Sequence, residues 1–284
     1  MAANLAKNGL TVTAWNRTPH RPGVEAAARA GATIASSIAE AVKNADVVFT
    51  CVSDVPDVEA VVLGAGGVAE FAQPGAIVVD TSTIGSQGAK QIGTTLEAKG
   101  FRFLDAPISG GDVGAKNGTL TIMVGGGKVD FDRCLPLFEA MGKNIRLCGP
   151  MGSGQAVKAC NQVLCAANLI GICEAMQLAQ QQNIDPHLIV EVCGTGAAGS
   201  WALSNLGEKI IDSDFAPGFA IKHILKDLRL VCETMPEPDN NLPGTTLADR
   251  LFKLAAELDG GAGGECGTQA MIRAYNDRRS TNNE

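Results

Sequence analysis

The chain contains 284 residues, of which 45% are hydrophobic and 19% are charged. This length is enough for one large or two ordinary domains with buried cores, and the composition excludes an intrinsically disordered chain. The formal net charge of −7 repels phosphate backbones, so we do not expect nucleic acid as a partner.

In the first half of the sequence, segments typical of helices alternate with segments typical of strands. The near-continuous apolar run at residues 46–52 is typical of a central parallel strand that is covered on both faces. The alternation predicts an α/β, Rossmann-like doubly wound parallel sheet over residues 1–150. We expect helices at residues 1–9, 22–30, 36–44, 57–63 and 86–99, and strands at 11–15, 46–52, 76–80, 101–106 and 120–125.

The second half has no strand pattern and predicts an all-α domain over residues 151–284, with the boundary near 150–152. It begins with a long interdomain helix at residues 154–182. Its most apolar part, residues 163–179, contains Asn168 and Glu174 and is too short to span a bilayer, so we expect a buried helix and no membrane. Further helices are expected at residues 186–192, 200–211, 221–234, 245–258 and 269–276.

The nine cysteines are scattered, without CxxC spacing, among Ala, Val and Leu. This pattern indicates buried, reduced thiols of a cytoplasmic protein and not a disulfide framework. The three histidines, His20, His187 and His223, lack metal-ligand spacing, so no metal site is expected.

A dinucleotide-binding sheet begins with a strand and a Gly-rich turn that presents helix amides to the pyrophosphate. Residue 1 already reads as part of the first helix, so we expect the chain as written to lack that strand and turn and to bind a dinucleotide weakly. The glycine clusters at residues 64–67 and 125–127 do not form GxGxxG turns that open helices, and they read as ordinary loops.

Three segments carry residues suited to chemistry. The segment DAPISGG at residues 105–111 combines glycines with the Ser109 hydroxyl, which suits an anion, although a flexible loop has the same composition. In GSGQAVKACN at residues 152–161, Lys158 lies early in an apolar helix, where partial desolvation favours proton transfer; a surface lysine is the alternative. The segment WNRT at residues 15–18 contains Arg17, which suits a phosphate, and lacks the acidic residue that would bind a ribose hydroxyl. The alternative is an exposed turn in which Arg17 is solvated.

In combination, these segments resemble the β-hydroxyacid dehydrogenase family, which includes 3-hydroxyisobutyrate dehydrogenase and the glyoxylate/succinic semialdehyde reductases. The resemblance extends from residue 1 to about residue 274. It implies that Ser109, Gly110 and Gly111 bind the substrate carboxylate and that Lys158 is the catalytic general acid. The family has an Asn four residues after this lysine, where this chain has Gln162, so the substrate-binding role passes to Asn161.

The segment FAIKHILKD at residues 219–227 is similar to the C-terminal segment of the same family. The resemblance implies that Phe219 and Asp227 form a wall of the substrate site. The implied cofactor-binding residues are Asn16, Arg17, Thr18, Val52, Ser53, Thr83 and Lys226.

The implied activity is NADPH-dependent reduction of a small carboxylate-bearing aldehyde, of the glyoxylate or succinic semialdehyde type, to the hydroxyacid. The resemblance further implies a homodimer or homotetramer. One alternative is an NAD-dependent 3-hydroxyisobutyrate dehydrogenase. A non-catalytic binding module with the same fold is an alternative of another class.

Overall fold

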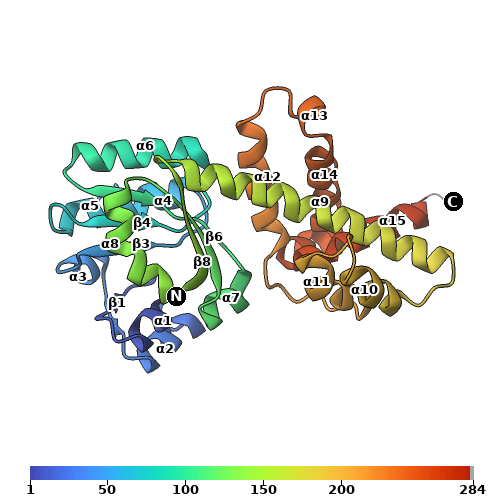
Figure 1. Ribbon diagram of the computed structural model, residues 1–284, viewed down its shortest axis with the longest axis horizontal. Helices are drawn as coiled ribbons and strands as arrows, with labels where there is room; N and C mark the ends of the chain where they lie inside the picture. Colours follow the sequence, from blue (N-terminus) through green and yellow to red (C-terminus); the bar gives the residue numbers. More distant parts are fainter. Residues whose placement is uncertain (282–284) are drawn as a thin grey trace. The chain divides into compact units, whose positions relative to one another are not determined.

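The structure is a computed structural model that describes residues 1–281, with side chains described as far as residue 276 (Figure 1). It divides into two compact units, Met1–Lys158 and Ala159–Glu284. The division falls inside helix α9 (Ser153–Gln181), whereas the sequence suggested a boundary near residues 150–152. The difference arises because the first residues of α9 contact the sheet of the first unit.

The first unit is built on a six-stranded, mostly parallel sheet. Its strand order is β3-β4-β5-β7-β6, and β8, which lies off this path, pairs with β7. Strands β3, β4 and β5 are mutually parallel, whereas β7 runs antiparallel to β5 and β6 and parallel to β8. The strands are β3 (Val47–Thr50), β4 (Ile77–Asp80), β5 (Arg102–Asp105), β6 (Ile108–Ser109), β7 (Leu120–Gly125) and β8 (Gly142–Gly149).

Two further strands, β1 (Thr13–Ala14) and β2 (Thr33–Ile34), form a separate parallel pair. Within residues 1–281, neither β1 nor β2 is hydrogen-bonded to β3 or to any other strand of the six-stranded sheet. The Rossmann-like arrangement predicted from the alternating pattern is therefore present in two pieces. It is preceded by helix α1 (Ala2–Lys7), in which Leu5 is buried against the six-stranded sheet.

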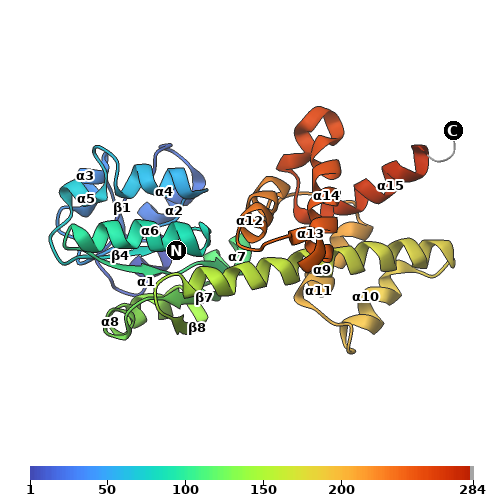
Figure 2. The same ribbon diagram turned by 90° about the horizontal axis from the view of Figure 1, so that it is seen from above.

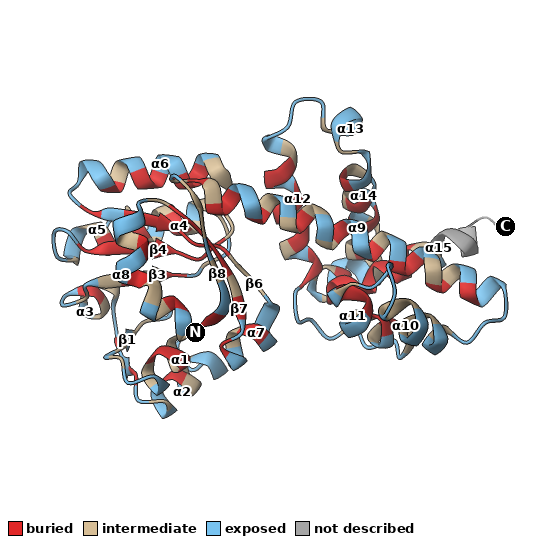
Figure 3. Cartoon of the chain, in the orientation of Figure 1, coloured by how far each residue is buried: buried red, intermediate tan, exposed pale blue. Residues whose placement is uncertain are grey.

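Helices cover both faces of the six-stranded sheet (Figure 2). On β4, Val78 faces a core shared with α4 and α6, while Ile77 and Val79 face a core shared with α8. The prediction of a central strand at residues 46–52 was wrong, because β3 stands at one end of the strand order and only Val48 and Thr50 of its four residues are buried. The strand with all four residues buried is β4 (Figure 3). The helices of this unit are α2 (Pro22–Arg29), α3 (Ile38–Val42), α4 (Val55–Val62), α5 (Val68–Phe71), α6 (Gly85–Ala98), α7 (Gly111–Asn117) and α8 (Lys128–Glu139).

Several elements of the first unit were not predicted from the sequence: β2, β6, β8, α5, α7 and α8. Two of these helices begin at the glycine clusters, because Gly67 is the N-cap residue of α5 and Gly127 that of α8. Apart from Gly125, which ends β7, both clusters lie in turns or loop as expected, but the helix that follows each of them was not predicted. Helix α8 is hard to recognise because Pro136 lies inside it, a residue that ordinarily ends a helix.

The second unit is helical, as predicted. One side of α9, which includes Ala166, Leu169 and Cys173, is buried in a core with α12 and α14. The remaining elements are α10 (Pro186–Gly194), α11 (Trp201–Ile211), α12 (Ile221–Glu233), α13 (Pro238–Asn241), α14 (Pro243–Glu257), the 3-10 helices η1 (Leu258–Glu265) and η2 (Thr268–Met271), and α15 (Ile272–Thr281).

Helix α9 has 29 residues and a stretch of mean hydropathy 1.4, and one third of that stretch is buried. The helix is thus long and apolar enough to cross a membrane, which the length of its most apolar part had led us to exclude. Its buried residues recur every three or four positions, as in the core helix of a globular domain.

The nine cysteines are free thiols. Cys134 and Cys173 are buried, and burial raises the pKa of each thiol to about 12. Cys51 and Cys160 are exposed and the other five are half-buried, so the expectation of buried thiols is confirmed only for Cys134 and Cys173. In the case of Cys160, the apolar sequence around it belongs to a helix with an exposed side.

Candidate active site

A row of polar residues crosses the carboxyl ends of the three parallel strands of the first unit. Thr50 of β3 is paired in register with Asp80 of β4, which is paired with Asp105 of β5. Both carboxylates are fully buried. The carboxyl ends of parallel strands are where open α/β sheets bind ligands, so this edge positions the candidate site.

Asp105 joins two of the motifs found in the sequence. It is the first residue of the 105–111 segment, and its carboxylate accepts hydrogen bonds from the backbone N–H groups of Gly152 at 2.6 Å and Gln155 at 2.9 Å. These are donors at the start of α9, so Asp105 caps the helix that carries Lys158. Burial raises the pKa of Asp105, against the opposing effect of these hydrogen bonds.

The glycines around Asp105 make this close approach possible. A Cβ atom on Gly154 would lie 2.7 Å from the backbone oxygen of Asp105 and would also collide with the backbone oxygen of Met123. Gly152 has φ of +89°, a conformation that favours glycine. The GSG sequence ahead of Lys158 is therefore explained by packing of α9 against the ends of β5 and β7.

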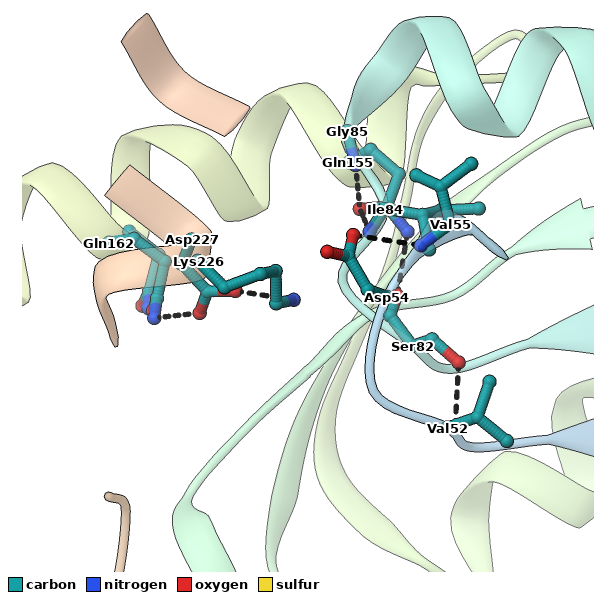
Figure 4. Close-up of polar contacts among 11 residues, drawn as sticks. Val52, Asp54, Val55, Ser82, Ile84, Gly85, Gln155, Gln162, Lys226 and Asp227 are labelled. Carbon is teal, nitrogen blue, oxygen red and sulfur yellow. Dashed lines mark hydrogen bonds and ion pairs between the residues drawn. The ribbon is translucent and has the colours of Figure 1, made fainter. Parts of the chain in front are cut away.

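Lys158 lies in the second turn of α9 and is only 6% exposed. The structure confirms the prediction that Lys158 is shielded from solvent. Three residues earlier, the buried side chain of Gln155 accepts hydrogen bonds from the N–H groups of Ile84 and Gly85 and donates one to the carbonyl of Ser82 (Figure 4). Gln155 thereby ties the start of α9 to the loop between β4 and α6.

The same loop is tied to the end of β3 through Asp80. The Asp80 carboxylate accepts hydrogen bonds from the hydroxyls of Thr50 and Ser82, both at 2.7 Å. The Ser82 Oγ in turn accepts the backbone N–H of Val52 at 2.9 Å. Burial raises the pKa of Asp80 to about 6, which outweighs the hydrogen bonds that lower it. These contacts were not foreseen, although polar residues at the ends of apolar strands were a usable signal.

The segment expected to bind a carboxylate lies between a strand and a helix. Ser109 is half-buried in β6, and the exposed Gly110 and Gly111 precede and begin α7, with φ of +128° and +62°. The structure therefore contains a strand and a helix in place of the flexible loop that was the alternative interpretation of this segment. Glycine is required because both backbones adopt positive φ.

Except for Lys226, which lies in α12, the residues expected to bind the cofactor lie at the carboxyl ends of strands. Asn16, Arg17 and Thr18 follow β1 and are exposed, and the guanidinium of Arg17 lies 3.5 Å from the carboxylate of Asp57. Of the others, Ser53 is exposed after β3, and Val52 and Thr83 are half-buried after β3 and β4. An exposed guanidinium beside amide and hydroxyl side chains fits the phosphate and ribose groups of a dinucleotide.

In the second unit, the side chain of Gln162 lies beside Asp227, a residue that was predicted to line the substrate site. Gln162 is 2% exposed, and its Nε2 donates a hydrogen bond of 2.5 Å to Oδ2 of the buried Asp227 (Figure 4). The Nζ of Lys226 lies 2.7 Å from the other carboxylate oxygen, as an ion pair. Asn161, to which the substrate-binding role was given, is half-buried and donates to Oε1 of Gln162 and to Sγ of Cys165.

Phe219 precedes α12, is 37% exposed and stacks on the ring of His223, with 6.0 Å between centroids. Burial and the neighbouring Lys222 and Lys226 lower the pKa of His223. Over the side chains described, residues 1–276, no group of three His, Cys, Asp or Glu is arranged to hold a metal ion.

Comparison with known proteins identifies the class of this fold and site. Residues 1–149 match the family described as the NAD binding domain of 6-phosphogluconate dehydrogenase. Residues 152–275 match the family described as NAD-binding of NADP-dependent 3-hydroxyisobutyrate dehydrogenase. The chain therefore has a Rossmann-like NAD(P)-binding domain followed by a helical domain.

Individual relatives agree with this class. The uncharacterised oxidoreductase slr0229 of Synechocystis sp. is 54% identical over 275 residues, which are 97% of this chain and 93% of that protein. The 2-hydroxy-3-oxopropionate reductase of Escherichia coli is 36% identical over 92% of this chain and 88% of its own length. The crystal structure of a 3-hydroxyisobutyrate dehydrogenase from Salmonella typhimurium has a TM-score of 0.84 and 29% identity, with 96% and 94% of the two chains covered. The chain belongs to the β-hydroxyacid dehydrogenase family.

Proposed function

We propose that the protein uses NADPH to reduce a small carboxylate-bearing aldehyde, of the glyoxylate or succinic semialdehyde type, to the corresponding hydroxyacid. Family membership supports an NAD(P)-dependent hydroxyacid dehydrogenase. The observation that carries the proposal is the double role of Asp105. It begins the segment that contains Ser109, and it caps the helix in which Lys158 is buried.

In this proposal, the Ser109 hydroxyl and the backbone N–H groups of Gly110 and Gly111 hold the substrate carboxylate. NADPH, when bound, supplies the hydride that the carbonyl carbon receives. The Nζ of Lys158 donates a proton to the carbonyl oxygen, and burial of the lysine favours release of that proton. In the oxidative direction, Lys158 accepts the proton. The helical unit contributes Asn161, Phe219 and Asp227 to substrate binding.

For the cofactor, the proposal assigns Arg17, with Asn16 and Thr18, to the 2′-phosphate of NADPH, because the segment has a guanidinium where NAD-binding proteins have an acid. Val52, Ser53, Thr83 and Lys226 complete the cofactor-binding set. The description of the matched C-terminal family as NADP-dependent supports this preference. The alternative within the family is an NAD-dependent 3-hydroxyisobutyrate dehydrogenase. The solved Salmonella relative, a 3-hydroxyisobutyrate dehydrogenase, supports the substrate of this alternative.

We further propose a homodimer or homotetramer located in the cytoplasm. Residues 1–150 form the NADP-binding domain, which also contains Ser109, and residues 151–284 form the substrate and dimerisation domain, which also contains Lys226. A non-catalytic binding module with the same fold is the alternative of another class. The burial of Lys158 favours an enzyme, because a lysine with no chemical role is ordinarily exposed.

The test is Lys158→Ala, assayed with NADPH and NADH against glyoxylate, succinic semialdehyde and 2-hydroxy-3-oxopropionate. General acid catalysis contributes about 10²- to 10⁴-fold, so we expect kcat to fall by that factor while the Kd for NADPH stays within about threefold. Lys116→Ala, on the exposed side of α7, is the control. Retention of most of kcat in the Lys158 variant would show that the lysine is not the proton donor. Wild-type protein without turnover on any of these aldehydes would favour the binding module.

A further inference from the structure

The contacts of Gln162 carry an inference that rests on the proposed role of Lys226 in cofactor binding. We propose that Gln162 is a positioning residue that acts through Asp227 to place the ammonium group of Lys226. Gln162 lies on α9, and Asp227 and Lys226 lie on α12, within the same unit. Gln162 occupies the position four residues after Lys158, where the family has an Asn. Because its side chain donates to Asp227, the role proposed for it differs from the substrate contact expected of that Asn.

Asp227 lies in an apolar environment. Its side chain is 3% exposed, and its helix neighbours Ile224 and Leu228 are fully buried in the core of the second unit. A carboxylate in such surroundings needs hydrogen-bond donors or an opposite charge. Gln162 provides a donor at 2.5 Å and Lys226 provides the charge at 2.7 Å.

The two oxygens of this carboxylate have different neighbours. Gln162 contacts Oδ2, while the Nζ of Lys226 is the neighbour of Oδ1, which accepts no hydrogen bond within residues 1–276. The hydrogen bond to Oδ2 restricts rotation of the carboxyl group and therefore fixes where Oδ1 lies. The position of Oδ1 in turn determines where the ammonium at the end of the flexible lysine chain is attracted.

The orientation of the Gln162 amide is fixed by a hydrogen bond from its neighbour. Its Oε1 accepts a hydrogen bond from Nδ2 of Asn161 at 2.7 Å, so its Nε2 is the group directed at Asp227. The chain of contacts thus runs from Asn161 through Gln162 and Asp227 to Lys226. The extra methylene of glutamine is needed for this contact, because an Asn amide would be withdrawn by about 1.5 Å, the length of one C–C bond.

The experiment compares the Gln162→Leu and Gln162→Asn variants with Lys226→Met. A hydrogen bond to a charged group contributes enough for about a tenfold change in an equilibrium constant. We therefore expect either Gln162 variant to raise the KM for NADPH about tenfold while kcat stays within about threefold. Lys226→Met should raise this KM at least as much, and Gln162→Leu should add nothing in the Lys226→Met background, because both changes disable the same group.

The matched control is Gln177→Leu. Gln177 is another glutamine of α9, and its Nε2 donates to Oδ1 of Asn276 in the same unit at 2.7 Å. This variant should lower the melting temperature without changing the KM for NADPH. A raised KM in Lys226→Met with unchanged KM in both Gln162 variants would overturn the inference alone. An unchanged KM for NADPH in Lys226→Met would overturn the cofactor role of Lys226 and the inference with it. If the effects of Gln162→Leu and Lys226→Met on this KM add fully in the double variant, the inference is also overturned.

Discussion

The buried carboxylate of Asp80 should make the stability of the first unit depend on pH. Asp80 is fully buried at the end of β4, and Oδ2 has no hydrogen-bond partner within residues 1–276. Burial raises its pKa from 3.8 to about 6, and the nearby charge of Asp105 acts in the same direction. The folded protein therefore binds this proton more tightly than the unfolded chain does.

Protonation of Asp80 therefore stabilises the folded protein. The stabilisation by the Asp80 proton is complete below pH 3.8, the pKa of the unfolded chain, and is lost as the pH rises through about 6. A shift of about two pKa units corresponds to about 3 kcal/mol. Asp80→Asn keeps the shape of the side chain and removes the titration. We thus expect the unfolding free energy of wild type minus that of Asp80→Asn to fall by about 3 kcal/mol between about pH 4 and pH 7.5.

The assay is urea unfolding followed by tryptophan fluorescence. The chain has two tryptophans, so Trp201→Phe leaves Trp15 as the sole reporter and restricts the signal to the first unit. Asp46→Asn, an exposed position before β3, controls for the loss of one negative charge. A difference between wild type and Asp80→Asn that stays constant over this pH range would show that Asp80 ionises equally in the folded and unfolded chains.

Two further outcomes are expected. Arg17→Ala should weaken NADPH binding about ten- to hundredfold and leave NADH binding nearly unchanged, because a charge-assisted phosphate contact contributes about 1.5–3 kcal/mol. Fluorescence titration measures both affinities, and equal losses for the two cofactors would contradict the 2′-phosphate role of Arg17. Gly154→Ala should destabilise the protein by about 1–3 kcal/mol in urea, because its Cβ would meet backbone oxygens of Asp105 and Met123. The control Gly171→Ala on the same helix, with nothing within 4 Å, should stabilise by up to about 1 kcal/mol, and a Gly154 variant as stable as wild type would refute this account of the GSG sequence.

Local patterns were sufficient for the elements of the fold whose signal is contained in a short window. The apolar run before Asp80, fully buried in β4, and the three-to-four-residue period of the helices depend only on which faces are covered. The burial of Lys158 could also be predicted, because the residues around it in the helix are apolar. The same reasoning failed for α5, which begins after Gly67, and for α8, which begins after Gly127 and contains Pro136.

Contacts between residues far apart in the chain were decided only by the tertiary structure. Asp105 caps α9 across 47 and 50 residues, and Gln162 reaches Asp227 across 65 residues. Residue type favoured Asn161 over Gln162, because the family's residue in this role is an Asn, while positions three and four after Lys158 both lie on its side of the helix. Which of the two amides meets Asp227 depends on how α12 packs against α9, and that packing is set by the whole core of the second unit and not by any local pattern.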